Sequence, residues 1–251
     1  MTNIILVGCN GRMGRMITET VLEDPLVSIA AGVDIAGGRL SDYPVFTDIY
    51  QVDKAADCIV DFGNASAVSR VTSYSIEKGI PLVECTTGLS EEQLNGLCDA
   101  SKSVAVLRSS NMSIGVNILD KVLKAVSRTL YETGFDIEIV EKHHKMKLDA
   151  PSGTAVSLAE TINEACGDEL EYVYDRTGVR QKRDKKELGI SAIRGGTIVG
   201  DHDVIFAGQD EVITFSHRAY SRAVFAKGAI EAAKFLSGRS AGYYSMSDVI
   251  K

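Results

Sequence analysis

The stretch ILVGCNGRMGRMI, residues 5–17, joins an apolar run to a helical pattern through a turn with three glycines. In such a unit Gly8 permits a tight turn, Gly11 lets a pyrophosphate approach the backbone, and Gly14 lets the helix lie close to the sheet. Amide groups at the helix start, together with the helix dipole, attract phosphate charge. Asp34 follows a second apolar run about 20 residues further on, where an acid accepts hydrogen bonds from a ribose. The stretch predicts a dinucleotide site, although GxxGxxG is less common than GxGxxG and a glycine turn used only for packing is the alternative.

Residues 1–110 alternate short apolar runs with amphipathic stretches. The runs are rich in valine and isoleucine and end in glycine, aspartate, threonine or serine: NIILVG, VSIAAGVD, ADCIVDFG, IPLVECTT and VAVLRSS. Ser90, with Gln93 three residues later, forms a capping box that predicts the start of one intervening helix. Strands that alternate with helices form βαβ units. We therefore expect an α/β fold whose first half is a Rossmann-like, doubly wound parallel sheet.

The pattern changes after residue 113. The stretch GVNILDKVLKAVSRTL places Val116, Leu119, Leu123, Val126 and Leu130 on one helical face. The stretch FDIEIVEKHH alternates apolar and polar residues, which is typical of a half-exposed strand. ISAIRGGTIVGDHDVIFAGQDEVITFSH predicts two or three further strands, and the basic stretch before it predicts a mobile loop.

The last predicted helix, SRAVFAKGAIEAAKFLSG, can return to the first half of the chain. We therefore predict a dinucleotide-binding domain made of residues 1–113 plus 222–251. A second, α+β domain covers residues 114–221.

The composition excludes several classes of protein. A net charge of −7 argues against a nucleic-acid or membrane-surface binder. No apolar run approaches the roughly 20 residues of a spanning helix, and the opening MTNIILVGCNG is typical of a strand rather than a signal peptide. The five cysteines are scattered without a CxxC pair, which favours a reducing cytoplasm over a disulfide framework.

The segment EKHHKMKLDAPSGTA, residues 141–155, concentrates two histidines and three lysines on an acidic background. Lys147 supplies positive charge, and the Ser152-Gly153-Thr154 turn opens a helix whose first amides point outward. This combination predicts an anion site. A metal site is not expected, because adjacent strand residues point to opposite faces and the lysines repel a cation.

The chain resembles the dihydrodipicolinate reductase family. The motifs VGCNGRMGRMI, ECTTG, SSNMSIGVN, EKHHKMKLDAPSGTA and IRGGTIVGDHDVIF occur in the family's order and at roughly its spacing, over nearly the whole chain. The resemblance implies reduction of a cyclic dicarboxylate, 4-hydroxy-tetrahydrodipicolinate, by NADH or NADPH in the diaminopimelate route to lysine. It also implies a homotetramer formed through the substrate-binding domain, residues 114–221.

The resemblance assigns roles to individual residues. His143 and Lys147 match the family's catalytic positions, and His144, Gly153 and Thr154 match its substrate-binding positions. The cofactor-binding positions fall on the glycine turn, the ribose acid, the threonine turn and the loop into the second domain: Gly8, Cys9, Asn10, Gly11, Arg12, Met13, Asp34, Cys85, Thr86, Thr87, Ser109, Ser110, Asn111 and Met112. Cys85 departs from the family, where glycine is common. The sequence leaves open whether His143 or Lys147 delivers the proton.

Cofactor choice depends on the residues around the ribose acid. Asp34 would repel a 2′-phosphate and Ile35 is apolar, which leaves Arg12 and Arg39 as possible phosphate partners. We hypothesise that NADH is preferred and NADPH tolerated.

Two other functions remain as alternatives. Another two-domain dehydrogenase of the semialdehyde type would need an acylating cysteine, yet the second domain offers only Cys166, within a helical pattern. A redox-sensing regulator would keep the nucleotide fold but would not need the histidines and Lys147. His202 and His217 are interpreted as hydrogen-bonded structural histidines. Arg194 and Arg222 could orient the site, but neither is chosen as a site residue.

Overall fold

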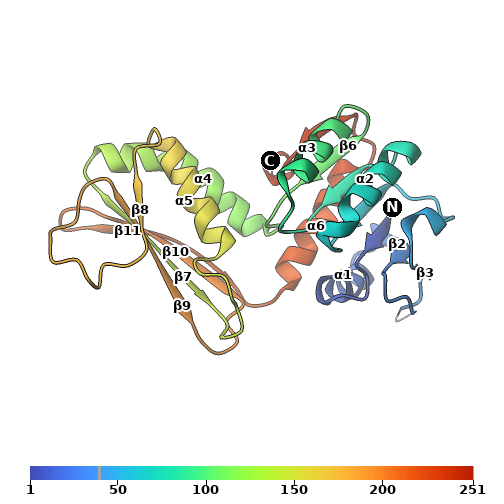
Figure 1. Ribbon diagram of the computed structural model, residues 1–251, viewed down its shortest axis with the longest axis horizontal. Helices are drawn as coiled ribbons and strands as arrows, with labels where there is room; N and C mark the ends of the chain where they lie inside the picture. Colours follow the sequence, from blue (N-terminus) through green and yellow to red (C-terminus); the bar gives the residue numbers. More distant parts are fainter. Residues whose placement is uncertain (39–40, 251) are drawn as a thin grey trace. The chain divides into compact units, whose positions relative to one another are not determined.

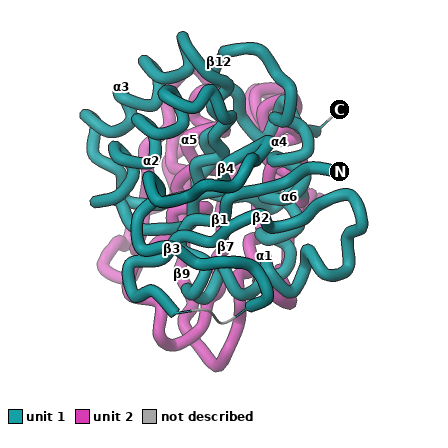
Figure 2. Tube along the Cα trace, turned by 90° about the vertical axis from the view of Figure 1, so that its right-hand side faces the viewer, with its two compact units in different colours: residues 1–114, 222–251 teal, residues 115–221 magenta. Residues whose placement is uncertain are grey.

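A computed structural model describes residues 1–38 and 41–250 of the chain (Figure 1). Two compact units are present, one formed by Met1–Ile114 with Arg222–Lys251 and the other by Gly115–Ser221 (Figure 2). Each unit has its own apolar core. Arg39, a possible phosphate partner in the sequence, lies outside the described residues.

The first unit is built on a seven-stranded sheet in the order β12-β6-β5-β4-β1-β2-β3, and all its strand pairs are parallel. The strands are β1 (Thr2–Val7), β2 (Val27–Val33), β3 (Val45–Phe46), β4 (Cys58–Asp61), β5 (Leu82–Glu84), β6 (Ala105–Arg108) and β12 (Gly242–Tyr244). The strand order reverses between β1 and β4, and in such sheets ligands bind outside the carboxyl ends of the strands at this switch point.

Helices cover both faces of this sheet (Figure 1). They are α1 (Arg12–Leu22), α2 (Ala65–Lys78), α3 (Glu91–Ala100), α6 (Ala223–Leu236), the short α7 (Met246–Val249) and the 3-10 turn η1 (Ile49–Gln51). One core joins α1 and α6 to the sheet, and a second core joins α2 and α3 to the opposite face. The predicted doubly wound fold and the capping box of Ser90 and Gln93 at the start of α3 are both confirmed.

The second unit carries a five-stranded sheet in the order β11-β10-β7-β9-β8. Its elements are α4 (Ile114–Glu132), β7 (Asp136–His143), α5 (Gly153–Ala165), β8 (Glu171–Val173), β9 (Glu187–Arg194), β10 (Gly200–Ala207) and β11 (Val212–Ala219). Strand β10 runs antiparallel to β7 and β11, whereas β9 runs parallel to β7 and β8. Both helices share one core with the sheet. The predicted α+β character is confirmed.

The alternation read from the sequence sets the orientation of β7. Ile137, Ile139, Glu141 and His143 face the buried side, while the residues between them are half-buried. The basic stretch before β9 has no helix or strand. Hydrogen bonds nevertheless attach this segment to the sheet. The Arg183 guanidinium donates to the side chains of Asp136 and Glu138 in β7 and to the backbone carbonyls of Ile137 and Glu187. No helix among the described residues combines the length and apolarity needed to cross a membrane.

Candidate functional site

The glycine turn between β1 and α1 has the geometry expected from its sequence. Gly8 has a φ of +75°, and a Cβ there would lie 2.6 Å from the carbonyl oxygen of Phe62. At Gly14 a Cβ would lie 2.3 Å from the carbonyl oxygen of Gly8, so only glycine lets α1 come this close. The turn and packing roles predicted for these two glycines are confirmed. Gly11 is the exposed N-cap residue of α1.

The predicted ribose acid is bound to the glycine turn. The Asn10 amide donates to Asp34 Oδ2 over 3.0 Å, and the Ala36 amide donates to Asp34 Oδ1 over 3.0 Å. The Asn10 side chain in turn donates to the carbonyl of Gly37 over 2.7 Å. Each carboxylate oxygen has further lone-pair capacity for a ribose hydroxyl. Asp34 is therefore held beside the glycine turn, and its carboxylate can still accept further hydrogen bonds from a ligand.

A cavity of about 530 Å³ lies over these residues. It is lined by residues from the carboxyl ends of β1, β2 and β4 and by side chains of η1 and α2, including Gly8, Gly11, Asp34, Ile35, Gly63 and Arg70. The Arg70 guanidinium forms two-pronged contacts of 2.6–3.1 Å with Asp48 and lies 4.6 Å from the Tyr50 ring centre. The sequence reading missed Arg70 and Gly63. For Gly63, the sequence signal would have been its position just after the predicted strand that ends at Asp61, because that strand lies beside β1 in the sheet. For Arg70 the sequence held no such signal.

The threonine turn follows β5 at the same edge of the sheet. Cys85 is 5% exposed and its side chain belongs to the apolar core on the α1 and α6 face. Burial raises the pKa of this thiol well above its usual range. At this position, where the family often has glycine, the cysteine side chain therefore fills space in the core. Thr86 is buried and Thr87 is exposed.

The loop after β6 is held by its own hydrogen bonds. The Ser109 hydroxyl donates to the Asn111 carbonyl over 2.8 Å, and the Ser113 amide donates to Asn111 Oδ1 over 2.9 Å. Met112 is 2% exposed, and its carbonyl oxygen would lie 1.7 Å from a Cβ at Gly228 of α6. The positions predicted to bind the cofactor thus lie at the carboxyl ends of β1, β2, β5 and β6. Among the remaining ones, Arg12 and Ser110 are exposed, Met13 is half-buried and Cys9 is buried.

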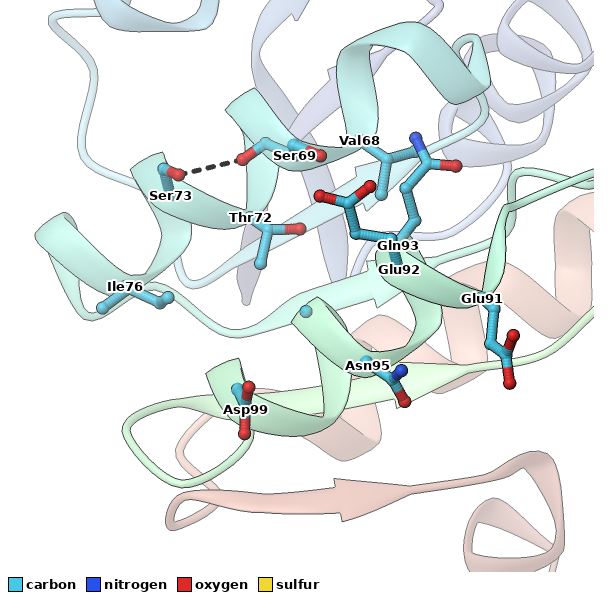
Figure 3. Close-up of a pocket in the computed structure, with 11 residues that line it drawn as sticks. Val68, Ser69, Thr72, Ser73, Ile76, Glu91, Glu92, Gln93, Asn95 and Asp99 are labelled. Carbon is cyan, nitrogen blue, oxygen red and sulfur yellow. Dashed lines mark hydrogen bonds between the residues drawn. The ribbon is translucent and has the colours of Figure 1, made fainter.

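Another cavity of the same unit, about 640 Å³, lies between α2 and α3 (Figure 3). Glu91, Glu92 and Asp99 line it together with serine, threonine and amide side chains. None of the residues predicted from the sequence to bind cofactor or substrate lines it. An acidic lining repels the phosphates of a dinucleotide, so this cavity is not the cofactor site.

In the second unit, Glu141 is the centre of a buried network. Its side chain is fully buried, and His143 Nδ1 donates to its Oε2 over 2.7 Å. Arg194 donates to both carboxylate oxygens, over 2.7 Å to Oε2 and 2.6 Å to Oε1. The Ser152 amide also donates to Oε1, over 2.9 Å. One carboxylate therefore joins the histidine at the end of β7 to the turn that opens α5. Glu141 was not predicted from the sequence, and Arg194 was considered there only as a residue that could orient the site.

His202 of β10 completes this network. Its Nε2 lies 2.9 Å from Ser152 Oγ, which also caps α5 by accepting from the Ala155 amide. Its ring meets the His143 ring edge to face at 5.3 Å. The hydrogen bond predicted for His202 is confirmed.

Burial and charge set the protonation of this network. Burial lowers the pKa of His143 below its usual value, although the Glu141 carboxylate acts in the opposite direction. Burial also lowers the pKa of His202 to about 4. For Glu141, burial acts to raise the pKa, but hydrogen bonds from Arg194, His143 and the Ser152 amide bring it below its usual value. At neutral pH the two histidines are neutral and the carboxylate is charged.

The other predicted residues of this segment surround the network. Lys147 Nζ donates to Asp149 Oδ1 over 2.9 Å and to Oδ2 over 2.8 Å. The positive charge of Lys147 also contributes to the lowered pKa of His143. His144 is half-buried. Gly153 and Thr154 are the first residues of α5, and a Cβ at Gly153 would meet nothing within 4 Å. Among the described residues no group of histidine, cysteine and acidic side chains could hold a metal ion.

These features define the class of the protein: a two-unit oxidoreductase with a Rossmann-type dinucleotide unit and an α+β unit. Family models described as dihydrodipicolinate reductase, N-terminus and C-terminus, match residues 2–112 and 115–250. The 4-hydroxy-tetrahydrodipicolinate reductase of Clostridium tetani is 49% identical over 98% of this chain and 96% of its own. That of Caldanaerobacter subterraneus subsp. tengcongensis is 48% identical over 100% of this chain and 99% of its own. The chain belongs to the dihydrodipicolinate reductase family.

The fold agrees with this membership. A dipicolinate-bound dihydrodipicolinate reductase from Paenisporosarcina sp. TG-14 superposes with a TM-score of 0.83 at 22% identity, over 100% of both chains. At this identity the likeness concerns the fold alone.

Proposed function

We propose that this protein reduces 4-hydroxy-tetrahydrodipicolinate to tetrahydrodipicolinate with NADH or NADPH, in the diaminopimelate route to lysine. The observation that carries the proposal is 49% identity to a reductase of this name along almost the whole of both chains. The site agrees with it chemically, because a dicarboxylate needs cations and exposed amides, and the segment 141–155 supplies both.

The residues of the second unit would hold the substrate and supply the proton that accompanies hydride reduction. Gly153 and Thr154 open α5, so their amides and the helix dipole favour a carboxylate. Lys147 and His144 flank the same turn. The lowered pKa of His143 leaves it neutral at neutral pH, which favours the Lys147 ammonium as the proton donor. Glu141 and Arg194 then act through His143 by fixing its tautomer and orientation.

The residues of the first unit would hold the dinucleotide. The glycine turn, from Gly8 to Met13, and Asp34 suit the pyrophosphate and the adenosine ribose, and the turns after β5 and β6 suit the nicotinamide end. Asp34 repels a 2′-phosphate, and Ile35, which is 88% exposed, offers no cation in its place. NADH is therefore the preferred cofactor. Comparing kcat/KM for the two cofactors tests this, and a strong preference for NADPH would contradict it.

Assembly as a homotetramer through the second unit follows from the family resemblance. Light scattering during size-exclusion chromatography would give a mass of four chains. The scattered free cysteines favour the cytoplasm as the location.

The decisive experiment supplies the aldol product of pyruvate and aspartate semialdehyde together with NADH or NADPH, and follows cofactor oxidation. Substrate-dependent oxidation is the expected result. A redox-sensing regulator would bind the cofactor without oxidising it, and that outcome would replace the enzymatic function with the alternative.

A further inference from the structure

Two carboxyl side chains outside the assigned site are buried side by side in the first unit. Asp61 ends β4 and Glu84 ends β5, and the two residues are register partners on these neighbouring parallel strands. Both are completely buried. Register partners point to the same face of a sheet. Buried acids of this kind are rare because their charge is costly without a partner.

Each of the two acids is satisfied on one oxygen only. The Gly63 amide donates to Asp61 Oδ1 over 2.7 Å, and the Thr86 amide donates to Glu84 Oε1 over 2.7 Å. Asp61 Oδ2 and Glu84 Oε2 are buried without an N–H or O–H partner in the described chain. Two ionised carboxylates cannot hydrogen-bond to each other, whereas a protonated one donates to an ionised one. A single proton between the two side chains, which are register partners on neighbouring strands, would satisfy both.

In the described part of the chain, no cation forms an ion pair with Asp61 or Glu84. Arg108 is the register partner of Glu84 on β6, yet within residues 1–38 and 41–250 it forms no ion pair with either acid. The other titratable groups near the pair are Tyr243 of β12 and the buried thiols of Cys85 and Cys58. From α2 and α3, the core on this face brings apolar side chains and Tyr74. Burial raises the pKa of Asp61 to about 6; burial, with repulsion from Asp61, raises that of Glu84 to about 8.

The two amides that bind this pair belong to turns at the cofactor site. The turn of Phe62, Gly63 and Asn64 lines the cavity that also contains Gly8 and Asp34. A Cβ at Gly63 would lie 2.9 Å from Asp61 Oδ1, so this turn lies tightly against the acid. Thr86 belongs to the threonine turn after β5. The pair therefore anchors two turns of the site by their backbones.

We propose that Asp61 and Glu84 share one proton and are positioning residues for the dinucleotide, because together they hold the turns after β4 and β5 in the binding geometry. The inference rests on the proposed function only for the identity of the ligand. Loss of the shared proton at high pH places two charges in the same buried space. Their repulsion displaces the turns, and the dinucleotide then binds more weakly.

The test is the NADH dissociation constant of the full-length protein, measured by NADH fluorescence without substrate at about pH 7 and about pH 9. In the wild type the constant should rise about tenfold between these values, as Glu84 loses its proton. In Glu84→Gln the amide still donates to Asp61 and still accepts from Thr86. This variant should bind NADH within about twofold of the wild type at neutral pH and should lose the pH dependence.

The exposed carboxylate of Glu92 on α3 provides the matched control, and Glu92→Gln should keep the wild-type pH dependence. Infrared spectroscopy near pH 7 should show the carbonyl stretch of a protonated carboxylic acid in the wild type and its loss in Glu84→Gln. The absence of this band in the wild type, or the full pH dependence in Glu84→Gln, would overturn the inference. A wild type that binds no NADH at either pH would instead overturn the proposed function.

Discussion

At the scale of single residues, Glu141 determines how His143 can act. Its carboxylate holds Nδ1 of His143, which leaves Nε2 as the nitrogen that can exchange a proton with a ligand. Glu141→Gln removes the charge that raises the His143 pKa, so the pKa assigned to His143 in the kcat/KM profile should fall. Looser positioning of the ring should lower kcat/KM by about tenfold to hundredfold.

The control for this variant lies on the same strand. Glu138 also belongs to β7, but it is half-buried on the opposite face and pairs with Arg183. Glu138→Gln should leave the pH profile unchanged. An equal shift in both variants would mean that Glu141 acts only through stability.

Lys147 is the second residue whose role can be isolated. If Lys147 is the proton donor proposed above, Lys147→Ala should lower kcat by about a hundredfold or more, while the NADH dissociation constant should stay within about twofold. Lys145→Ala is the matched control, because Lys145 is an exposed lysine two positions away and should retain its kcat. An unchanged kcat in Lys147→Ala would remove this lysine from the mechanism.

At the scale of elements, the approach of α1 to the sheet depends on the absence of a single side chain. In Gly14→Ala the new methyl group would overlap the backbone of Gly8 and Cys9, at 2.3 and 2.5 Å. The free energy of unfolding should fall by about 1–3 kcal/mol, and NADH should bind more weakly because the glycine turn shifts.

Gly96 in α3 is the matched helical glycine, with nothing within 4 Å of an added Cβ. Gly96→Ala should raise the free energy of unfolding by about 0.5–1 kcal/mol, because alanine loses less backbone entropy in a helix. Urea unfolding of both variants measures the difference. Similar destabilisation in the two would argue against the close contact at Gly14.

Elements and sites that are local in the sequence were predictable, and contacts between distant segments were not. Hydrophobic periodicity predicted β7 and the apolar face of α4, and the glycine turn was recognisable within residues 5–17. The Glu141–Arg194 pair joins residues 53 positions apart, and the Arg70–Asp48 pair joins residues 22 apart. Only the sheet register brings Asp61 beside Glu84. A single sequence carries no register, so these partners appear only in the folded chain.

At the scale of the whole molecule, buried histidines and buried carboxyl groups make the free energy of unfolding change with pH in opposite directions. His143, His202 and His217 have lowered pKa values, so protonation of the unfolded chain opposes folding as the pH falls below about 6.5. Glu84 and Asp61 have raised pKa values, so the folded chain holds protons that the unfolded chain has released. In mildly acid solution both groups contribute to the pH dependence of the free energy of unfolding, and because the two contributions have opposite signs they partly cancel.

Between about pH 7.5 and pH 8 the histidines are almost entirely neutral in both states, and Asp61, with a pKa of about 6, is largely ionised. Glu84 alone among these groups remains protonated in the folded chain and ionised in the unfolded chain, because its pKa is raised from 4.5 to about 8. The free energy of unfolding should therefore fall as the pH rises through this window. Glu84→Gln has no proton to lose, so its urea midpoint should stay nearly constant over the same range. A wild-type midpoint that rises with pH in this window would contradict a buried, protonated Glu84.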